Sequence, residues 1–339
     1  MFEQVLQVPK GIIVPLTTPF KQKTNSSYAA DLNSVKKVTD YVIDEQGHSK
    51  TPLCQGVFPL GTTGEFWLLN PEEQLKVIDA VVSETNGRVP VLAGVTQIAD
   101  NEKPTLEQIA RINRMKENKP DFLVVQPLVF HSNRGLKYLF QKIKDSTDIP
   151  VVAYNFLGVI ESLMKWGIIK RTFKKENTQP ERLREISSYI SAFKDSSGDL
   201  SLFGKYLYSV AGTPVLGFLG DESKFYETFL TYKFNNNFGG GVLGIGNAAP
   251  WIIARLYNSI FDGDIGDMKT IQIEINKINK GYRASGNIPA VLKTVQGRRG
   301  LCEPVYSGNR VFGVEDIARK TLEIAGISRC YLEAAHSHE

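Results

Sequence analysis

Short apolar runs alternate with longer amphipathic segments along most of the chain. Val, Ile, Leu and Phe dominate the runs, whereas the segments between them place apolar residues three and four positions apart. The first pattern is typical of buried β-strands and the second of helices that cover a core with one face. The runs that we interpret as strands span residues 11–20, 55–61, 89–95, 121–127, 149–155, 190–195, 213–221 and 240–247.

Helical periodicity between these runs predicts a parallel sheet. Helices are expected at residues 71–85, 105–116, 134–145 and 222–234, often with acidic residues in the first turn. Strands that alternate with helices pair in parallel, and strands that are apolar throughout lie in a sheet buried on both faces. The eight units predict an α/β fold of the (β/α)8, or TIM barrel, type better than an open doubly wound sheet.

The last part of the chain has a different pattern. After residue 247 the periodicity is helical only, with segments at 251–261, 265–283, 288–296 and 315–324. We interpret these as the last barrel helix and an added C-terminal helical subdomain, and we predict a barrel over residues 1–262 and the subdomain over 263–339. A basic insertion at 170–185, KRTFKKENTQPERLRE, lengthens the link between the fifth and sixth strands and is expected to protrude.

Composition and charge exclude several classes of protein. Hydrophobic residues make up 42%, charged residues 22%, and the formal net charge is +4, which is ordinary for a soluble globular chain. No apolar run reaches the ~20 residues of a membrane span, and the opening MFEQVLQVPKG does not resemble a secretory signal, so a cytoplasmic protein is expected. The basic insertion has no nucleic-acid module beside it. The three cysteines form no C-x-x-C pair, which argues against disulfides and a metal site.

Lys194 is the first candidate for chemistry, because it lies at the end of the sixth apolar run, ISAFKD. A solvated lysine at a strand end is the ordinary interpretation. Alternation along a strand places Ala192 and Lys194 on one face and Phe193 on the other. If bulky Phe193 packs outward under the helices, Lys194 points into the barrel, where lost hydration lowers the amine pKa and frees it to form a Schiff base with a carbonyl.

Active groups of such barrels come from the carboxyl ends of strands, and this selects further candidates. Tyr154 ends the fifth run and shares a face with Val152, so its phenol could move protons in the barrel mouth; a packed tyrosine is the alternative. The turn GTTGE after the second run offers the hydroxyls of Thr62 and Thr63 and backbone N–H groups that suit a carboxylate, although it could be only a turn.

Two other features invite a functional interpretation. The stretch GGGVLG, residues 239–244, matches the G-x-G-x-x-G dinucleotide motif, but its apolar strand coincides with the glycines instead of preceding them. We therefore expect the glycines to let the eighth strand approach a ligand closely. His131, in the loop after the fourth strand, could act as a base or could simply be exposed to solvent.

Three motifs together resemble a known family. GVFPLGTTGEFWLL, then VVAYN, then AFKDSSGD occur in the order and spacing of the dihydrodipicolinate synthase and N-acetylneuraminate lyase family, whose members are Schiff-base enzymes with a (β/α)8 barrel. The similarity runs from about residue 11 to about residue 261. The resemblance implies a homo-oligomer, commonly a tetramer built from dimers, and neither a metal nor an organic cofactor, since the lysine imine is covalent.

The resemblance also implies roles for individual residues. Lys194 would form the imine with pyruvate or another 2-oxo acid, and Tyr154 would transfer protons. Thr62 and Thr63 would hold the substrate carboxylate, and the backbone around Leu243 would contact the bound 2-oxo acid.

Departures from the family pattern bear on the substrate. The synthases carry an arginine at the position of Val159 and a tyrosine pair after strand four, where this chain reads PLVFHSN. Both differences argue against lysine biosynthesis. Asp221 and Glu222, after Gly220, resemble the G-x-D-E stretch by which neuraminate lyases hold the hydroxylated tail of their substrate. Asp221 could instead be the N-cap of the following helix.

These observations predict a class I lyase that cleaves or forms a carbon–carbon bond in a hydroxylated 2-oxo acid or pyruvate. Aldol cleavage releasing pyruvate is the first expectation. The alternatives are a 2-oxo-3-deoxy sugar acid dehydratase, dihydrodipicolinate synthase itself, and a non-catalytic protein that only binds a 2-oxo acid. Only a small-molecule substrate and further copies of the chain are expected as partners.

Overall fold

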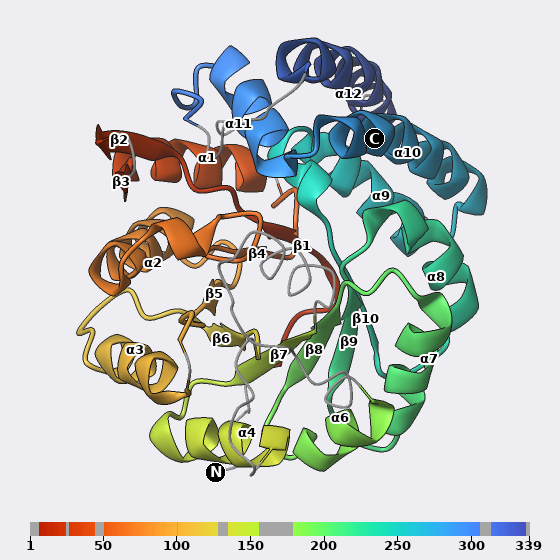
Figure 1. Ribbon diagram of the computed structural model, residues 1–339. Helices are drawn as coiled ribbons and strands as arrows, with labels where there is room; N and C mark the ends of the chain where they lie inside the picture. The colour runs from red at the N-terminus through yellow and green to blue at the C-terminus, as the bar shows by residue number, and fades with distance from the viewer. Residues whose placement is uncertain are drawn as a thin grey trace. The chain divides into compact units, whose positions relative to one another are not determined.

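The computed structural model describes residues 7–24, 27–44, 51–99, 101–127, 135–155, 179–305 and 313–336 (Figure 1). Its contacts divide the chain into two compact units. The middle unit comprises residues 1–10 and 92–242, and the end unit comprises residues 11–91 and 243–339.

Parallel strands form the core of the middle unit. In chain order they are β5 (Leu92–Gly94), β6 (Phe122–Val125), β7 (Val151–Asn155), β8 (Ala192–Asp195), β9 (Leu216–Leu219) and β10 (Phe238–Val242), and each pairs with the next. The helices between them are α3 (Lys103–Asn113), α4 (Gly135–Ser146), α6 (Pro180–Ile186), α7 (Leu200–Ser209) and α8 (Phe225–Tyr232), the last preceded by the 3-10 turn η3 (Glu222–Lys224). Nearly every strand residue is buried, as the uninterrupted apolar runs predict.

The end unit combines two parallel strands with most of the longer helices. Strands β1 (Gly11–Pro15) and β4 (Gly56–Phe58) pair in parallel, and β2 (Phe20–Thr24) and β3 (Ser27–Ala30) form an antiparallel hairpin. The helices are α1 (Leu32–Asp44), α2 (Pro71–Thr85), α9 (Pro250–Asp262), α10 (Ile265–Ser285), α11 (Ile288–Arg298) and α12 (Val314–His336), with 3-10 turns η1 (Phe66–Leu68) and η4 (Gly244–Asn247).

These elements confirm the predicted α/β class and the (β/α)8 barrel, since each of the eight apolar runs overlaps one of the eight parallel strands. Helix α2 has the predicted bounds because Pro71 starts it and the Asn70 side chain caps it, accepting a hydrogen bond of 2.9 Å from the Glu73 N–H. The β2–β3 hairpin was not predicted. The barrel and subdomain division at residue 262 stays a prediction, and residues 156–178, which include much of the basic insertion, lie outside the described residues.

The glycine-rich stretch at 239–244 is a strand followed by a 3-10 turn, because β10 runs from Phe238 to Val242. This geometry agrees with the rejection of a dinucleotide loop. At Gly239 the close neighbour is a side chain, since an added Cβ would lie 2.6 Å from the Phe218 ring. Packing inside the middle unit therefore requires this glycine, whereas the sequence suggested close approach of a ligand.

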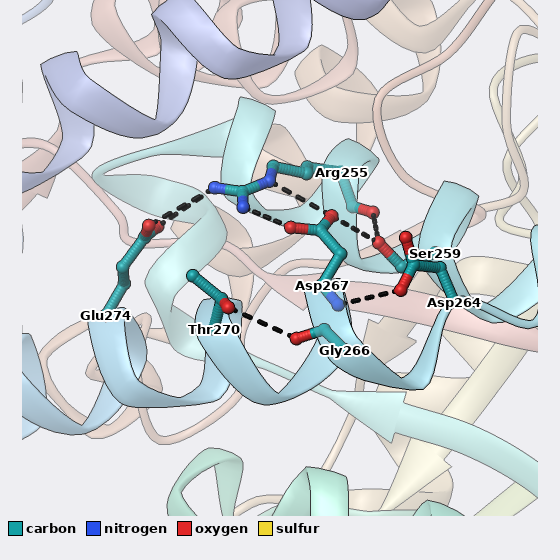
Figure 2. A network of polar contacts seen from close by, with 7 residues as sticks. All are labelled: Arg255, Ser259, Asp264, Gly266, Asp267, Thr270 and Glu274. Carbon is teal, nitrogen blue, oxygen red and sulfur yellow. Dashed lines mark hydrogen bonds and ion pairs between the residues drawn. The ribbon is translucent and has the colours of Figure 1, made fainter.

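A buried arginine fastens α10 to α9 in the end unit (Figure 2). Arg255 of α9 donates a hydrogen bond of 3.2 Å from its Nε to Asp267, contacts the same carboxylate through Nη2, and forms an ion pair of 3.2 Å with Glu274. The Ser259 hydroxyl donates to Asp267 at 2.6 Å. The guanidinium has carboxylate partners for its buried N–H groups, which is the condition for keeping such a charge inside a protein.

Candidate active site

Lys194 and Tyr154 are direct neighbours on adjacent strands of the middle unit. They are Cα partners in the parallel pairing of β8 with β7, so both side chains leave the sheet on the same face. The Lys194 Nζ lies 4.0 Å from the centroid of the Tyr154 ring. The structure thus brings together the two predicted catalytic residues.

The amine of Lys194 is buried, with only 5% of the residue exposed. Burial disfavours the charged form and lowers the pKa of this lysine from 10.5 to about 7, although the negative charge of Glu222 acts in the opposite direction. At neutral pH a large fraction of the molecules therefore carries a free amine, whereas an ordinary lysine is almost wholly charged. An amine with this property is a nucleophile for a carbonyl carbon.

The direction of Lys194 follows from the residues that flank it in the strand. Phe193 packs on the opposite face, with its ring centroid 6.0 Å from that of Phe203 and 5.8 Å from that of Tyr206 on α7. Ala192 is fully buried. The predicted alternation is confirmed, because the bulky ring packs under a helix and sends the lysine to the other side.

Gly220, just after β9, leaves the space that the lysine occupies. A Cβ added at this position would stand 1.8 Å from the Ser196 Oγ, which is closer than real Cβ atoms approach, and 3.0 Å from the Lys194 Cε, which is a tight contact. From the sequence, Gly220 is recognisable only as the start of the G-x-D-E stretch. Its packing role could be recognised only once the ends of β8 and β9 were known to be neighbours.

A polar network joins the ends of β7 and β8 on the face opposite Lys194. Asp195, fully buried, accepts hydrogen bonds from the Asn155 side chain at 3.0 Å and from the Ser197 hydroxyl at 2.8 Å. Asn155 also donates to the Tyr206 hydroxyl at 2.9 Å. Burial raises the pKa of Asp195 to about 6, although its hydrogen bonds oppose this. Sequence reasoning missed this network, because its partners are 40 and 51 residues apart.

Asp221 and Glu222 follow the next strand, and the structure distinguishes them. The Asp221 carboxylate caps η3, accepting hydrogen bonds from the Ser223 N–H at 3.0 Å and from the Ser223 hydroxyl at 2.6 Å. This agrees with the capping alternative for Asp221. Glu222 lies close enough to Lys194 for its charge to act on the lysine pKa.

The remaining predicted residues belong to the end unit. Thr62 and Thr63 are half-buried in the turn after β4, where the Gly64 N–H donates to the Gly61 carbonyl at 3.1 Å. Leu243 is fully buried after β10, and its N–H donates to the Ile13 carbonyl at 2.9 Å. A role of these residues beside Lys194 stays a prediction. His131 lies outside the described residues.

Among the described residues, no group of three His, Cys, Asp or Glu side chains is arranged to hold a metal ion. None of the helices described there is long and apolar enough to cross a membrane.

A barrel with a buried lysine of lowered pKa at a strand end defines an enzyme class, the lyases of the class I aldolase type, which act through a lysine imine. Comparison with known proteins agrees. The model of the dihydrodipicolinate synthetase family matches residues 8–323, so the chain belongs to this family.

Individual relatives are similar over most of the chain, and solved structures share its fold. A 4-hydroxy-tetrahydrodipicolinate synthase of Pelobacter propionicus is 29% identical over 297 residues, which cover 86% of this chain and 89% of the relative. The prophage protein YagE of E. coli K12, solved with pyruvate, has a TM-score of 0.73 at 20% identity, covering 93% of this chain and 98% of its own. N-acetylneuraminate lyase of Mycoplasma synoviae has a TM-score of 0.70 at 16% identity, covering 93% and 97%.

Proposed function

We propose that the protein cleaves a hydroxylated 2-oxo acid through an imine on Lys194 and releases pyruvate. The observation that carries this proposal is the buried Lys194 amine, with a pKa of about 7, lying 4.0 Å from the ring centroid of Tyr154. Family membership supports it, because the chain is a lyase of the class I aldolase type.

Each step can be assigned to these two side chains. The free amine of Lys194 attacks the ketone carbon C2 of the substrate, and the carbonyl electron pair moves to oxygen. Tyr154 donates the proton that lets the hydroxyl leave as water, which gives the iminium ion. Tyr154, now a phenolate, then takes the proton of the C4 hydroxyl, the C3–C4 bond breaks, and its electron pair moves into the iminium. An aldehyde leaves, and Tyr154 passes the proton it has taken to C3 of the enamine, which restores the iminium ion. Water then adds to C2 and gives its proton back to the Tyr154 phenolate, and the C–N bond breaks to release pyruvate and free Lys194.

The other candidate residues would bind parts of the substrate that do not react. Thr62 and Thr63 would hold the carboxylate through their hydroxyls, and the backbone around Leu243 would contact the 2-oxo acid. Glu222 would accept hydrogen bonds from hydroxyls of the substrate tail, since its charge reaches the lysine that carries the substrate. Asp221, which caps η3, would assist from the same turn. The imine itself is the electron sink, so the reaction needs no cofactor.

A second candidate function is 4-hydroxy-tetrahydrodipicolinate synthesis, in which the pyruvate enamine adds to an aldehyde instead of being released. It is favoured by the 29% identical synthase of Pelobacter propionicus. It is opposed by Val159 and the segment PLVFHSN, where synthases carry an arginine and a tyrosine pair.

A homo-oligomer, a dimer or a tetramer, also belongs to the proposal, and sedimentation of the purified chain tests it. A cytoplasmic location stays a prediction.

The central experiment is borohydride reduction in the presence of pyruvate, followed by mass mapping of peptides. We expect a reduced pyruvate adduct on Lys194 in the wild type and its loss in Lys194→Met. Lys205→Met, which removes an exposed lysine on α7, is the matched control and should keep the adduct. A wild type without an adduct on Lys194 would refute the proposal.

Assays with a panel of 2-oxo-3-deoxy sugar acids then distinguish the reactions. A lyase releases pyruvate, whereas a dehydratase forms a new 2-oxo product without pyruvate. A synthase consumes pyruvate when an aldehyde is supplied, and a non-catalytic binding protein forms the adduct without turnover.

A further inference from the structure

Lys293 of α11 has a buried amine that the proposed reaction does not use. The residue is fully buried, and its Nζ lies 2.5 Å from Glu65 Oε2, whose side chain is 3% exposed. The same amine donates to the Val305 carbonyl at 3.3 Å and lies 3.8 Å from the centroid of the Phe20 ring. All four residues belong to the end unit.

An ion pair this deeply buried is not explained by stability alone. Removing two charges from water costs several kcal/mol for each ion, and a pair of apolar residues of similar volume is often equally stable. The buried pair of Lys293 and Glu65 is better explained if it fixes the conformation of the backbone beside it. Glu65 is the last residue of the GTTGE turn, so the geometry that the ion pair fixes is that of this turn.

Glu65 needs to be held, because its backbone is left-handed, with φ 50° and ψ 43°. This conformation costs a residue with a Cβ roughly 1–2 kcal/mol. Two short hydrogen-bonded turns lead into it, from the Gly64 N–H to the Gly61 carbonyl and from the Glu65 N–H to the Thr62 carbonyl, both at 3.1 Å. The conformation of Thr62 and Thr63 is therefore continuous with that of Glu65.

The backbone of Gly64, next to Glu65 in the turn, is also confined. A Cβ added at Gly64 would stand 3.0 Å from Thr18 Oγ1 and 3.1 Å from the Leu16 carbonyl, so the backbone here packs directly on the segment after β1. With one side confined by packing and the end residue fixed by an ion pair, the turn has little freedom to rearrange.

We propose that Lys293 is a positioning residue that, through Glu65, holds the Gly61–Glu65 turn in the conformation that binds the substrate carboxylate. This inference rests on the proposed function, which gives Thr62 and Thr63 the carboxylate. It places one determinant of substrate binding on α11, 228 residues from the turn that it holds. The contacts described for Lys293 are with Glu65, Val305 and Phe20, so its effect should fall on binding of the carboxylate and not on the chemistry of the amine.

The test uses the paired variant Glu65→Gln/Lys293→Met, which removes both charges and so avoids leaving one buried and unpaired. The paired variant Arg255→Met/Asp267→Asn is the matched control, because it dismantles a buried ion pair of the same unit whose described partners all lie on α9 and α10. Thermal unfolding of both variants shows how far each one destabilises the fold.

Two measurements decide the matter. In the first, hydrogen exchange of the amides of residues 61–68 without substrate should become faster in Glu65→Gln/Lys293→Met and stay unchanged in the control. In the second, borohydride trapping compares pyruvate with acetone, which lacks the carboxylate. The half-saturating pyruvate concentration should rise about tenfold to a hundredfold, the scale of one charge-assisted hydrogen bond, whereas acetone trapping should not change.

The outcomes separate the two proposals. Unchanged exchange in the turn overturns the inference, and so does an equal loss of pyruvate and acetone trapping or an unchanged pyruvate half-saturation. A wild type that traps no pyruvate on Lys194 refutes the proposed function, and the exchange of the turn then still shows whether Lys293 holds it.

Discussion

Replacing Lys194 with methionine should make the protein more stable while abolishing the imine. Methionine has a similar length and carries no charge to bury. The pKa of Lys194 is lowered by burial from 10.5 to about 7, although Glu222 opposes this, and the difference corresponds to about 5 kcal/mol. The wild type bears this cost in full below pH 7, where the buried amine must be charged.

The pH dependence has a definite sign. Between pH 7 and 10.5 the unfolded chain holds a proton on Lys194 that the folded chain has lost, so the free energy of unfolding of the wild type rises with pH in this window. The methionine variant lacks the group. Its advantage should therefore be about 5 kcal/mol below pH 7 and should vanish near pH 10.5.

Urea unfolding at several pH values between about 6 and 10 measures this advantage. Lys205→Met, which removes an exposed amine from the same unit, serves as the control and should change the midpoint little. The reasoning is refuted if Lys194→Met is less stable than the wild type below pH 7, or if its advantage does not shrink as the pH rises.

Three further predictions concern the chemistry around the same lysine. Tyr154→Phe keeps the ring near the amine but removes the phenol, so turnover should fall about 10²- to 10⁴-fold in a pyruvate-release assay while the pyruvate adduct can still be trapped. Trapping in the wild type should fall about tenfold for each pH unit below 7, because the Lys194 amine becomes protonated. Glu222→Gln removes a charge that raises the pKa of Lys194, so the pH at which trapping begins to fall should be lower in this variant. A fall that began at higher pH would contradict the assignment. Gly220→Ala should reduce trapping, because its Cβ would overlap the Ser196 Oγ at 1.8 Å and crowd the Lys194 Cε at 3.0 Å, whereas Gly326→Ala, in open space, should not.

The sequence was sufficient for the features that depend on local periodicity. The apolar runs located the parallel strands, because a strand buried on both faces leaves an uninterrupted hydrophobic signature. The direction of Lys194 followed from Phe193 beside it, since a strand must send neighbouring side chains to opposite faces. The pairing with Tyr154 needed only the further assumption that consecutive units of a barrel lie side by side.

Features that depend on contacts between distant segments were not accessible in this way. The β2–β3 hairpin reads FKQKT and SYAA, which lack the apolar content of a core strand, and its pairing is set by the fold around it. The partners Glu65 and Lys293 are separated by 228 residues, so no spacing rule connects them. Arg255 and Asp267 are 12 residues apart and lie on different helices, outside the i, i+4 spacing of helical ion pairs.

The composition of the end unit has a consequence for how the chain is made. This unit contains residues 11–91 and 243–339. Residues 92–242 of the middle unit are therefore synthesised after the first segment of the end unit and before its second segment. At 5–20 residues per second, synthesis of residues 92–242 takes roughly 8–30 s. During that interval α9 and α11 have not yet been made, so they cannot complete the core around β1, β4 and the apolar faces of α1 and α2. Exposed apolar surface of this kind is prone to aggregation, so we expect the first part of the nascent chain to need protection until α9 and α11 have been made.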